Sequence, residues 1–255
     1  MRRVLIIGIG SGDPDHLTLQ AVKALQQVDV IFTLDKGPEK ATLAQLRAEI
    51  CQRHLSGRTY RTVSIRDPER DRRPASYEAE IRAWHERRLV EYERALTNCM
   101  SDGECGAFLV WGDPSLYDST LRIFEQLNVK GTVPVEYEVI PGITSIQALT
   151  ARHKICLNKI GQAVHITTGR NLERCPPSET DNVAVLLDGE LTLAGIDPQT
   201  TMIHWGAYLG TEHEILRSGR VAEVIDDVRA LRREAREKQG WIMDTYLLSK
   251  LGEDD

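Results

Sequence analysis

Short apolar runs alternate with segments of helical periodicity through the first 150 residues, and this alternation restricts the possible folds more than any other feature of the chain. Within the intervening segments, apolar residues recur every three to four positions, as they do along one face of a helix. A chain that alternates strands and helices folds into a mostly parallel sheet with helices on both faces. The runs that we interpret as buried strands are residues 4–9, 30–34, 61–65, 107–111 and 135–140. Residues 1–150 are therefore predicted to form one α/β domain.

The pattern changes after residue 150, where expected strands follow one another with few helices between them. These strands are residues 163–167, 183–187, 201–205 and 214–217. An amphipathic helix follows, because Val221, Val228 and Ala235 recur at helical spacing before Gly240, which is typical of a helix end. A last apolar run, residues 241–248, is interpreted as another strand. Residues 151–255 are thus predicted to form a second α/β domain with a mixed sheet, and two closely joined domains imply a cleft between them.

Composition and charge argue against several classes of function. No apolar run approaches the roughly 20 residues that cross a membrane, and the net charge of −6 disfavours nonspecific binding to nucleic acid, which needs a basic surface. The first apolar run ends in a glycine loop instead of the small-residue cleavage site of a signal peptide. The five cysteines form no C-x-x-C pair, which argues for reduced thiols. We therefore expect a cytoplasmic protein with no metal, no membrane partner and no nucleic-acid partner.

Three strand ends of the first domain carry a turn rich in glycine and proline, together with a small polar or acidic side chain. The turns are Gly8–Pro14, Trp111–Tyr117 and Pro141–Ser145. In parallel sheets ligands bind at the carboxyl ends of the strands, so these turns are predicted to converge on one site. Each turn taken alone is also explained as a helix cap, with Asp or Ser at the cap and proline in the first helical turn.

The first of these turns departs from the familiar nucleotide-binding patterns. Asp13 stands where the dinucleotide pattern G-x-G-x-x-G needs its last glycine, and a carboxylate is unfavourable beside a pyrophosphate. Ile6 stands where the common methyltransferase fold has an acidic residue, two positions before the first glycine. Asp35, at the end of the second strand, keeps a nicotinamide-dependent reductase open as an alternative.

Taken together, the three turns resemble the hallmark loops of the tetrapyrrole (corrin/porphyrin) methylases: G-x-G-x-G-D-P near the amino terminus, G-D-P before a helix, and P-G-I-T-S. Leu186–Gly189 and Gly206–Glu214 resemble the strand-end and domain-closing segments of the same family, so the resemblance covers essentially the whole chain. The segments that resemble family members acting on a corrin precursor with release of acetate are residues 67–72, 84–88, 108–122, 151–153 and 167–170.

This resemblance implies a homodimer whose protomers each hold S-adenosylmethionine in the cleft between two α/β domains and release S-adenosylhomocysteine. Carried over position by position, the expected cofactor-binding residues are Gly112, Asp113, Leu116, Thr144, Ser145, Leu187, Ala207 and Thr245. Main-chain groups are expected to recognise the adenine. Leu187 stands where relatives often have methionine.

The resemblance also implies the reaction, which is methylation of precorrin-5 at C1 followed by loss of an acyl group as acetate. Alignment of the two reacting carbons and a water-excluding site are expected to supply much of the rate. Loss of the acyl group needs water or a proton shuttle, for which Asp13 is the first candidate and Tyr117 the second. Asp13 has an alternative role as a cap for the helix that begins near Leu19. Another precorrin or uroporphyrinogen methyltransferase of the family, or a carrier without catalytic activity, remain alternatives for the whole protein.

The substrate carries many carboxylates, which planar guanidinium groups bind through two hydrogen bonds at once. The expected substrate-binding arginines are Arg66, Arg70, Arg72, Arg122, Arg152 and Arg170. Arg87 and Arg88 are instead predicted to lie on the solvated face of a helix. His85 and His153 are interpreted either as hydrogen-bond donors to the substrate or as packing residues.

Overall fold

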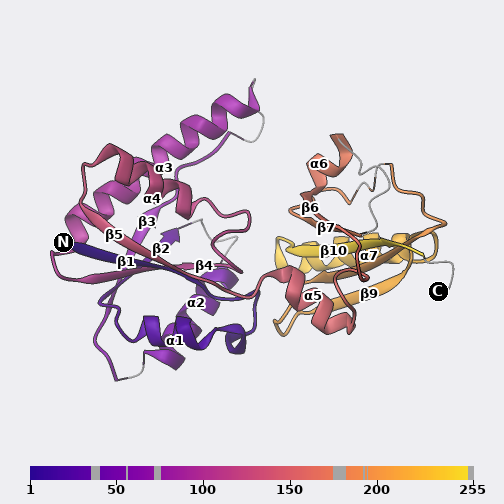
Figure 1. The fold of residues 1–255 in the computed structure, drawn as a ribbon, viewed down its shortest axis with the longest axis horizontal. Helices are drawn as coiled ribbons and strands as arrows, with labels where there is room; N and C mark the ends of the chain where they lie inside the picture. The colour runs from indigo at the N-terminus through magenta and orange to yellow at the C-terminus, as the bar shows by residue number, and fades with distance from the viewer. Residues whose placement is uncertain are drawn as a thin grey trace. The chain divides into compact units, whose positions relative to one another are not determined.

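The computed structural model describes residues 1–35, 41–55, 57–71, 76–174, 182–191, 193 and 195–251. The chain forms two compact units, each with its own sheet (Figure 1). The first unit comprises residues 1–10 and 14–143, and the second comprises residues 11–13 and 144–255. Arg72 and Cys175 lie outside the described residues.

The first unit is built on a five-stranded sheet in the order β3-β2-β4-β1-β5, in which every neighbouring pair is parallel. Its strands are β1 (Arg2–Gly8), β2 (Val30–Asp35), β3 (Arg61–Arg66), β4 (Cys105–Val110) and β5 (Val135–Ile140). The predicted parallel sheet is therefore confirmed. Its first strand, β1, lies between β4 and β5, so the carboxyl ends of these three strands are adjacent.

Helices cover both faces of this sheet, with α1 and α2 on one face and α3 and α4 on the other (Figure 1). Their bounds are Leu19–Leu25 for α1, Ala41–His54 for α2, Tyr77–Cys99 for α3 and Thr120–Lys130 for α4; a short 3-10 helix, η1, spans Pro14–His16. Because successive strand residues point to opposite faces, Leu5 packs in the core beneath α1 and α2, and Ile6 packs in the core beneath α3 and α4.

Side-chain hydroxyls cap two helices of the first unit at their starts. The hydroxyl of Thr18 accepts a hydrogen bond from Ala21 N at 3.0 Å and begins α1. The hydroxyl of Ser76 accepts one from Ala79 N at 3.4 Å and begins α3. Such caps satisfy backbone donors that the first helical turn leaves without a partner.

The prediction that Arg88 lies on a solvated helix face is wrong. Arg88 is only 3% exposed, and its Nε lies 2.9 Å from Asp67 Oδ1 in an ion pair. The guanidinium carbon lies 4.6 Å from the centre of the Trp84 ring, and Nη1 donates to Ser119 Oγ. A buried charge persists when it is paired, and Arg88 has both an acidic partner and an aromatic one. Arg87 is exposed, as predicted.

The second unit is built on a five-stranded sheet in the order β6-β7-β10-β8-β9. Only β6 and β7 are parallel, and the other pairs are antiparallel, so the predicted mixed sheet is confirmed. The strands are β6 (Val164–Thr168), β7 (Asn182–Leu186), β8 (Thr201–Ala207), β9 (Ile215–Arg220) and β10 (Asp244–Lys250). Beneath them α7 (Val221–Gln239) buries Val228 and Ala235 in a core with Trp205 and Tyr246.

Two helices of this unit were not predicted, α5 (Ser145–His153) and α6 (Gly169–Arg174). Leu149 of α5 packs on the sheet where Gly206 has no side chain, because a Cβ at Gly206 would lie 2.8 Å from a methyl of Leu149. Thr144 and Gln147 form a capping box at the start of α5, which is a recognisable helix signal in the sequence.

In the part of the chain that the structure describes, no helix is long and apolar enough to span a membrane. The same residues contain no cluster of His, Cys, Asp or Glu side chains able to hold a metal ion. The four described cysteines are free thiols: Cys51, Cys99, Cys105 and Cys156.

Candidate active site

The turns that follow β1, β4 and β5 pack against one another through their main chains. Gly10 N donates to Gly112 O at 3.3 Å, and Gly112 N donates to Gly10 O at 2.7 Å. A Cβ at Gly8 would lie 2.6 Å from Gly142 N, and one at Gly142 would lie 2.1 Å from Gly112 O. Only glycine permits this approach, so the three turns predicted to converge do meet at one edge of the first sheet.

The carboxylate of Asp113 links two of these turns. Its Oδ2 accepts a hydrogen bond from Gly142 N at 2.8 Å. Its Oδ1 accepts hydrogen bonds from Ser115 N at 2.8 Å and from Ser115 Oγ at 2.5 Å. Partial burial acts to raise the pKa of Asp113, but these hydrogen bonds outweigh burial and hold the pKa below its ordinary value. Asp113 is thus an ionised carboxylate that fixes the shape of the site.

The same turn presents Leu116 and Tyr117. Leu116 is half-buried, and its N–H donates to Asp113 O at 3.2 Å. Tyr117 is 46% exposed and has a left-handed backbone with a φ of 52°. Burial of part of its ring raises the pKa of Tyr117, so the phenol is protonated at neutral pH. A protonated phenol donates a hydrogen bond and does not act as a base.

The second unit brings the predicted cofactor residues Ser145, Ala207 and Thr245 close to one row of residues across its sheet. Thr245 of β10 lies opposite Leu186 of β7 and opposite Gly206 of β8. Ala207 follows in the same register, opposite Asp244. The hydroxyl of Thr245 donates to Ser145 Oγ at 2.9 Å. The start of α5, the end of β7 and the end of β8 therefore meet around Thr245.

Leu187, which follows this row directly, is held in an unfavourable conformation. It is 68% exposed and has a left-handed φ of 52°. Such a backbone conformation costs on the order of 1–3 kcal/mol in a residue other than glycine, and residues that adopt it occur most often at functional sites. An exposed leucine kept in this state offers apolar surface to a ligand.

Asp13 belongs to the second unit by its contacts, and it is half-buried. Its neighbour Gly12 packs closely there, because a Cβ at Gly12 would lie 2.3 Å from Leu209 O. The cap of α1 is Thr18, so the alternative in which Asp13 caps that helix is wrong.

Three of the predicted substrate arginines are exposed on the first unit: Arg66 at the end of β3, Arg70 in the following loop and Arg122 on α4. The guanidinium carbon of Arg70 lies 6.0 Å from the centre of the Trp84 ring. Burial and the charges of Arg88 and Arg122 lower the pKa of His85. Cationic side chains therefore cluster around Trp84 and His85.

The predicted arginines of the second unit have different surroundings. Arg152 forms an ion pair with Glu214, with 2.5 Å between Nε and Oε1, so its charge is already balanced. Arg170 is exposed on α6. His153 Nε2 lies 3.0 Å from Trp205 O, which supports its interpretation as a packing residue.

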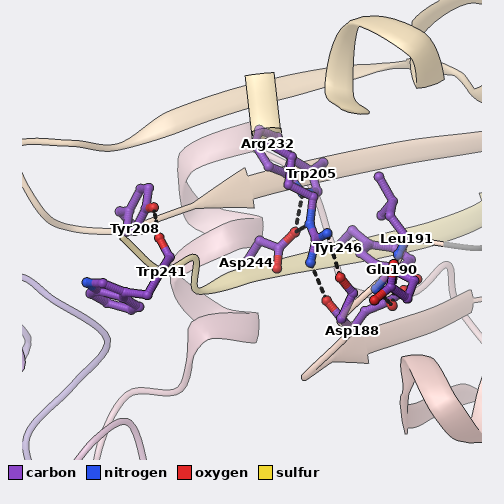
Figure 2. A network of polar contacts seen from close by, with 10 residues as sticks. Asp188, Glu190, Leu191, Trp205, Tyr208, Arg232, Trp241, Asp244 and Tyr246 are labelled. Atoms are coloured by element: carbon purple, nitrogen blue, oxygen red, sulfur yellow. Dashed lines mark hydrogen bonds and ion pairs between the residues drawn. The ribbon is translucent and has the colours of Figure 1, made fainter. Parts of the chain in front are cut away.

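The sequence reasoning missed a buried polar network that includes Asp244, the residue before Thr245 on β10 (Figure 2). It centres on Arg232 and Asp244, and it reaches Asp188 and Tyr246. A signal for Arg232 exists in the sequence, because this residue stands four positions after Val228 and three before Ala235. A charged residue at the spacing of an apolar helix face is placed in the core, where it needs partners.

Comparison with known proteins adds to this geometry. Residues 3–225 match the family described as Tetrapyrrole (Corrin/Porphyrin) Methylases. The precorrin-6A synthase [deacetylating] of a Sinorhizobium species is 48% identical over 250 residues, which are 98% of this chain and 96% of the relative. The cobalt-precorrin-4 C(11)-methyltransferase of Priestia megaterium is 24% identical, over 97% of this chain and 91% of the relative.

Solved structures show the same relationship. A cobalamin synthesis related protein of Corynebacterium diphtheriae has a TM-score of 0.83 and 42% identity, over 99% of this chain and all of that one. The uroporphyrin-III C-methyltransferase of Thermus thermophilus, solved in complex with S-adenosylhomocysteine, shares the fold with a TM-score of 0.59 and 20% identity, over 97% of each chain. The chain belongs to the tetrapyrrole (corrin/porphyrin) methylase family.

Proposed function

We propose that this protein is an S-adenosylmethionine-dependent C-methyltransferase of corrin-ring biosynthesis that methylates precorrin-5 at C1, releases acetate and yields precorrin-6A. The observation that carries the proposal is the 48% identity, over nearly the full length of both chains, to a relative named precorrin-6A synthase [deacetylating]. Family membership and the geometry of the loops support it.

The residues around the loops fit this cofactor better than they fit a nucleotide with phosphates. None of the turns 8–14, 111–118, 141–145, 187–190 and 207–212 contains lysine or arginine, while four of the five contain Asp or Glu. Phosphates favour cationic partners, whereas an acidic surrounding favours a cation. When bound, S-adenosylmethionine supplies a methyl group on a positively charged sulfur.

In this proposal the protein binds the cofactor chiefly through main-chain groups and small side chains. Gly112, Asp113 and Leu116 contribute from the turn that Asp113 holds in shape. Thr144 and Ser145 contribute from the start of α5, where Ser145 already accepts a hydrogen bond from Thr245. Leu187 provides apolar surface for the adenine, and Ala207 and Thr245 lie in the adjoining row of the sheet. S-adenosylhomocysteine is released as the product.

Exposed arginines are assigned to bind the polycarboxylate substrate. Arg66, Arg70 and Arg122 are exposed on the first unit, and Arg170 is exposed on the second. Arg152 contributes only if the substrate displaces Glu214 from its ion pair. Arg72 completes the set, although it lies outside the described residues.

The loss of acetate needs one water molecule and one proton acceptor. Water adds to the acyl carbonyl carbon, the bond from that carbon to the ring breaks, and the electron pair returns to the conjugated ring. Asp13 is assigned as the group that takes the proton from this water. Tyr117, whose raised pKa keeps its hydroxyl protonated, is assigned as a donor to the oxyanion that forms on the acyl oxygen.

The working protein is proposed to be a cytoplasmic homodimer. The family resemblance supports this, and a light-scattering mass of twice the 28.7 kDa chain is the expected result. A monomeric mass that persists at micromolar concentration and in the presence of cofactor would contradict it.

Thermal unfolding in the presence of cofactor tests the proposal. At a concentration 100 times its dissociation constant, a ligand of the folded state stabilises it by about 2.7 kcal/mol. S-adenosylhomocysteine is therefore expected to raise the Tm by several degrees, while NAD leaves the Tm unchanged. A Tm that neither S-adenosylmethionine nor S-adenosylhomocysteine raises at near-millimolar concentration, or a shift with NAD instead, would contradict the assignment.

A further inference from the structure

A guanidinium group buried in the second unit connects the ends of two strands. Arg232 of α7 is 9% exposed. Its Nε donates to Asp244 Oδ2 at 2.8 Å, its Nη1 donates to Gly189 O at 2.8 Å, and its Nη2 donates to Asp188 O. Asp244 begins β10, and the carbonyl groups of 188 and 189 belong to the turn that follows β7. One side chain thus holds a strand start and a strand-end turn together (Figure 2).

The turn after β7 is also held from within by the carboxylate of Asp188. Its Oδ1 accepts hydrogen bonds from Glu190 N at 3.0 Å and from Leu191 N at 2.9 Å. Its Oδ2 accepts one from the Tyr246 hydroxyl at 2.6 Å. Burial and this hydrogen bond raise the pKa of Tyr246 above its ordinary value, so the hydroxyl is a permanent donor. Main-chain and side-chain atoms of Asp188 are therefore both fixed by buried groups.

Two of the residues assigned to the cofactor adjoin this network in the chain. Leu187 directly precedes Asp188, and its strained backbone persists because the turn that follows it is fixed. Thr245 directly follows Asp244, whose Oδ2 also accepts a hydrogen bond from Trp205 Nε1 at 2.9 Å. Displacement of Asp188 and Asp244 would therefore move Leu187 and Thr245.

Stability alone does not explain why a buried cation, the guanidinium of Arg232, occupies this position. Well-packed apolar residues often replace a buried ion pair with no loss of stability. Two of the three hydrogen bonds of Arg232 go to carbonyl groups of a turn, and an apolar side chain cannot make them. What Arg232 supplies in particular is the position of that turn relative to β10.

We propose that Arg232 is a positioning residue for the methyl donor: through Asp244 and the carbonyl groups of Asp188 and Gly189, it sets where Leu187 and Thr245 meet the cofactor. This inference rests on the proposed function, because it assumes that the donor contacts these two residues. Arg232 itself touches neither the donor nor the tetrapyrrole in this account.

The test compares Arg232→Met, Arg232→Lys and the control Arg233→Met, which changes an exposed arginine on the same helix. Isothermal titration calorimetry measures the dissociation constant of S-adenosylhomocysteine for the folded protein. We expect an increase of at least tenfold for Arg232→Met, a smaller increase for Arg232→Lys, which keeps the charge and one hydrogen bond, and no change for Arg233→Met.

Steady-state kinetics of Arg232→Met are expected to show a higher KM for S-adenosylmethionine and a kcat within threefold of the unaltered enzyme. A residue with a merely structural role would lower the Tm and leave both the dissociation constant and the KM of the folded fraction unchanged.

A second variant keeps the test decisive if Arg232→Met does not fold. Tyr246→Phe removes only the hydroxyl that holds Asp188, and it is expected to raise the same dissociation constant by at least threefold. Hydrogen exchange without ligand should then become faster at the amides of Glu190 and Leu191. The proposal is overturned if Arg232→Met folds and binds S-adenosylhomocysteine as the unaltered protein does, or if it does not fold and Tyr246→Phe binds normally. Failure of the unaltered protein to bind S-adenosylhomocysteine would instead overturn the proposed function.

Discussion

At the scale of single residues, Asp113 shows how a motif residue can act through the main chain. Its carboxylate accepts three hydrogen bonds, and one of them ties Gly142 of the next turn. Removal of the carboxylate leaves the partly buried N–H of Gly142 without this acceptor, which costs up to about 1–3 kcal/mol. Asp113→Ala is therefore expected to lower the free energy of unfolding in urea by that amount and to weaken the binding of S-adenosylhomocysteine. Asp102→Ala, at a side chain that is 72% exposed, is the control. If Asp113→Ala binds normally, Asp113 does not shape the cofactor site.

At Leu187, the effect of a substitution on stability can be measured separately from its effect on cofactor binding. Its left-handed backbone and its 68% exposure are both unfavourable for leucine, and asparagine tolerates this backbone better. Leu187→Asn is expected to leave the Tm unchanged or to raise it, while the affinity for S-adenosylhomocysteine falls by about tenfold, or about 1.4 kcal/mol. Leu19→Asn, at a leucine that is 79% exposed on α1, should leave the affinity unchanged. A lower Tm with unchanged affinity would show that Leu187 serves packing alone.

Sequence reasoning at this scale failed where a charged residue occupied an apolar helix position. Arg88 lies midway between Trp84 and Tyr92 at four-residue spacing, and Arg232 follows Val228 at the same spacing. Both are buried and hydrogen-bonded. Arg88 was predicted to lie on a solvated helix face although it occupies an apolar position of that helix, and nothing was predicted for Arg232. The partners of such an arginine come from distant segments, so they are not visible in local periodicity.

At the scale of elements, the ion pair between Arg61 and Glu104 joins the starts of β3 and β4. Two guanidinium nitrogens lie 2.7 Å and 2.6 Å from the two carboxylate oxygens. The hydrogen bonds from Arg61 and from Ser101 N lower the pKa of Glu104 to about 2. A depressed pKa contributes stability above the unfolded value of about 4.5, and this contribution disappears as the pH falls toward 2. The difference in urea midpoint between the unaltered protein and Glu104→Gln is therefore expected to be larger at pH 7 than at pH 3.

The control for this pH dependence is Glu49→Gln, at an exposed glutamate of α2. Its urea midpoint should follow that of the unaltered protein at both pH values. An equal difference for Glu104→Gln at pH 7 and pH 3 would mean that the ion pair does not couple the two strands in solution.

The packing of the turns gives a steric prediction at the same scale. In Gly142→Ala the added methyl would lie 2.1 Å from Gly112 O, so the two turns must separate. Overpacking of this kind typically costs about 1–3 kcal/mol, and urea unfolding should detect it together with weaker cofactor binding. Gly189→Ala is the control for stability, because no atom lies within 4 Å of the added methyl. Equal unfolding midpoints for the two variants would contradict the observed packing.

Most elements followed from the sequence, because strands buried on both faces and long amphipathic helices carry strong patterns. All five strands of the parallel sheet and the helix α7 were predicted within a few residues. The short helices α5 and α6 were missed, since nine and six residues hold too few turns for periodicity to appear. For α5 the capping box of Thr144 and Gln147 was a usable signal. Which strands are neighbours depends on long-range pairing and could not be read from local pattern.

At the scale of the whole molecule, the family follows from three short turns whose meaning depends on their common position. Each turn has an ordinary explanation as a helix cap, and only the order of strands, with β1 between β4 and β5, makes them one site. The residues assigned to cofactor in the second unit likewise meet because β7, β10 and β8 are neighbours. The choice of reacting carbon rests on kinship, since no local pattern distinguishes one position of a macrocycle from another.

The most direct test of the central claim is mass spectrometry of the product formed from precorrin-5 and S-adenosylmethionine labelled with carbon-13 in the methyl group. The account predicts a corrinoid that has gained one labelled methyl and lost the two-carbon acyl unit, with one acetate released for each methyl transferred. A product that keeps the acyl unit, or that carries no labelled methyl, would contradict it.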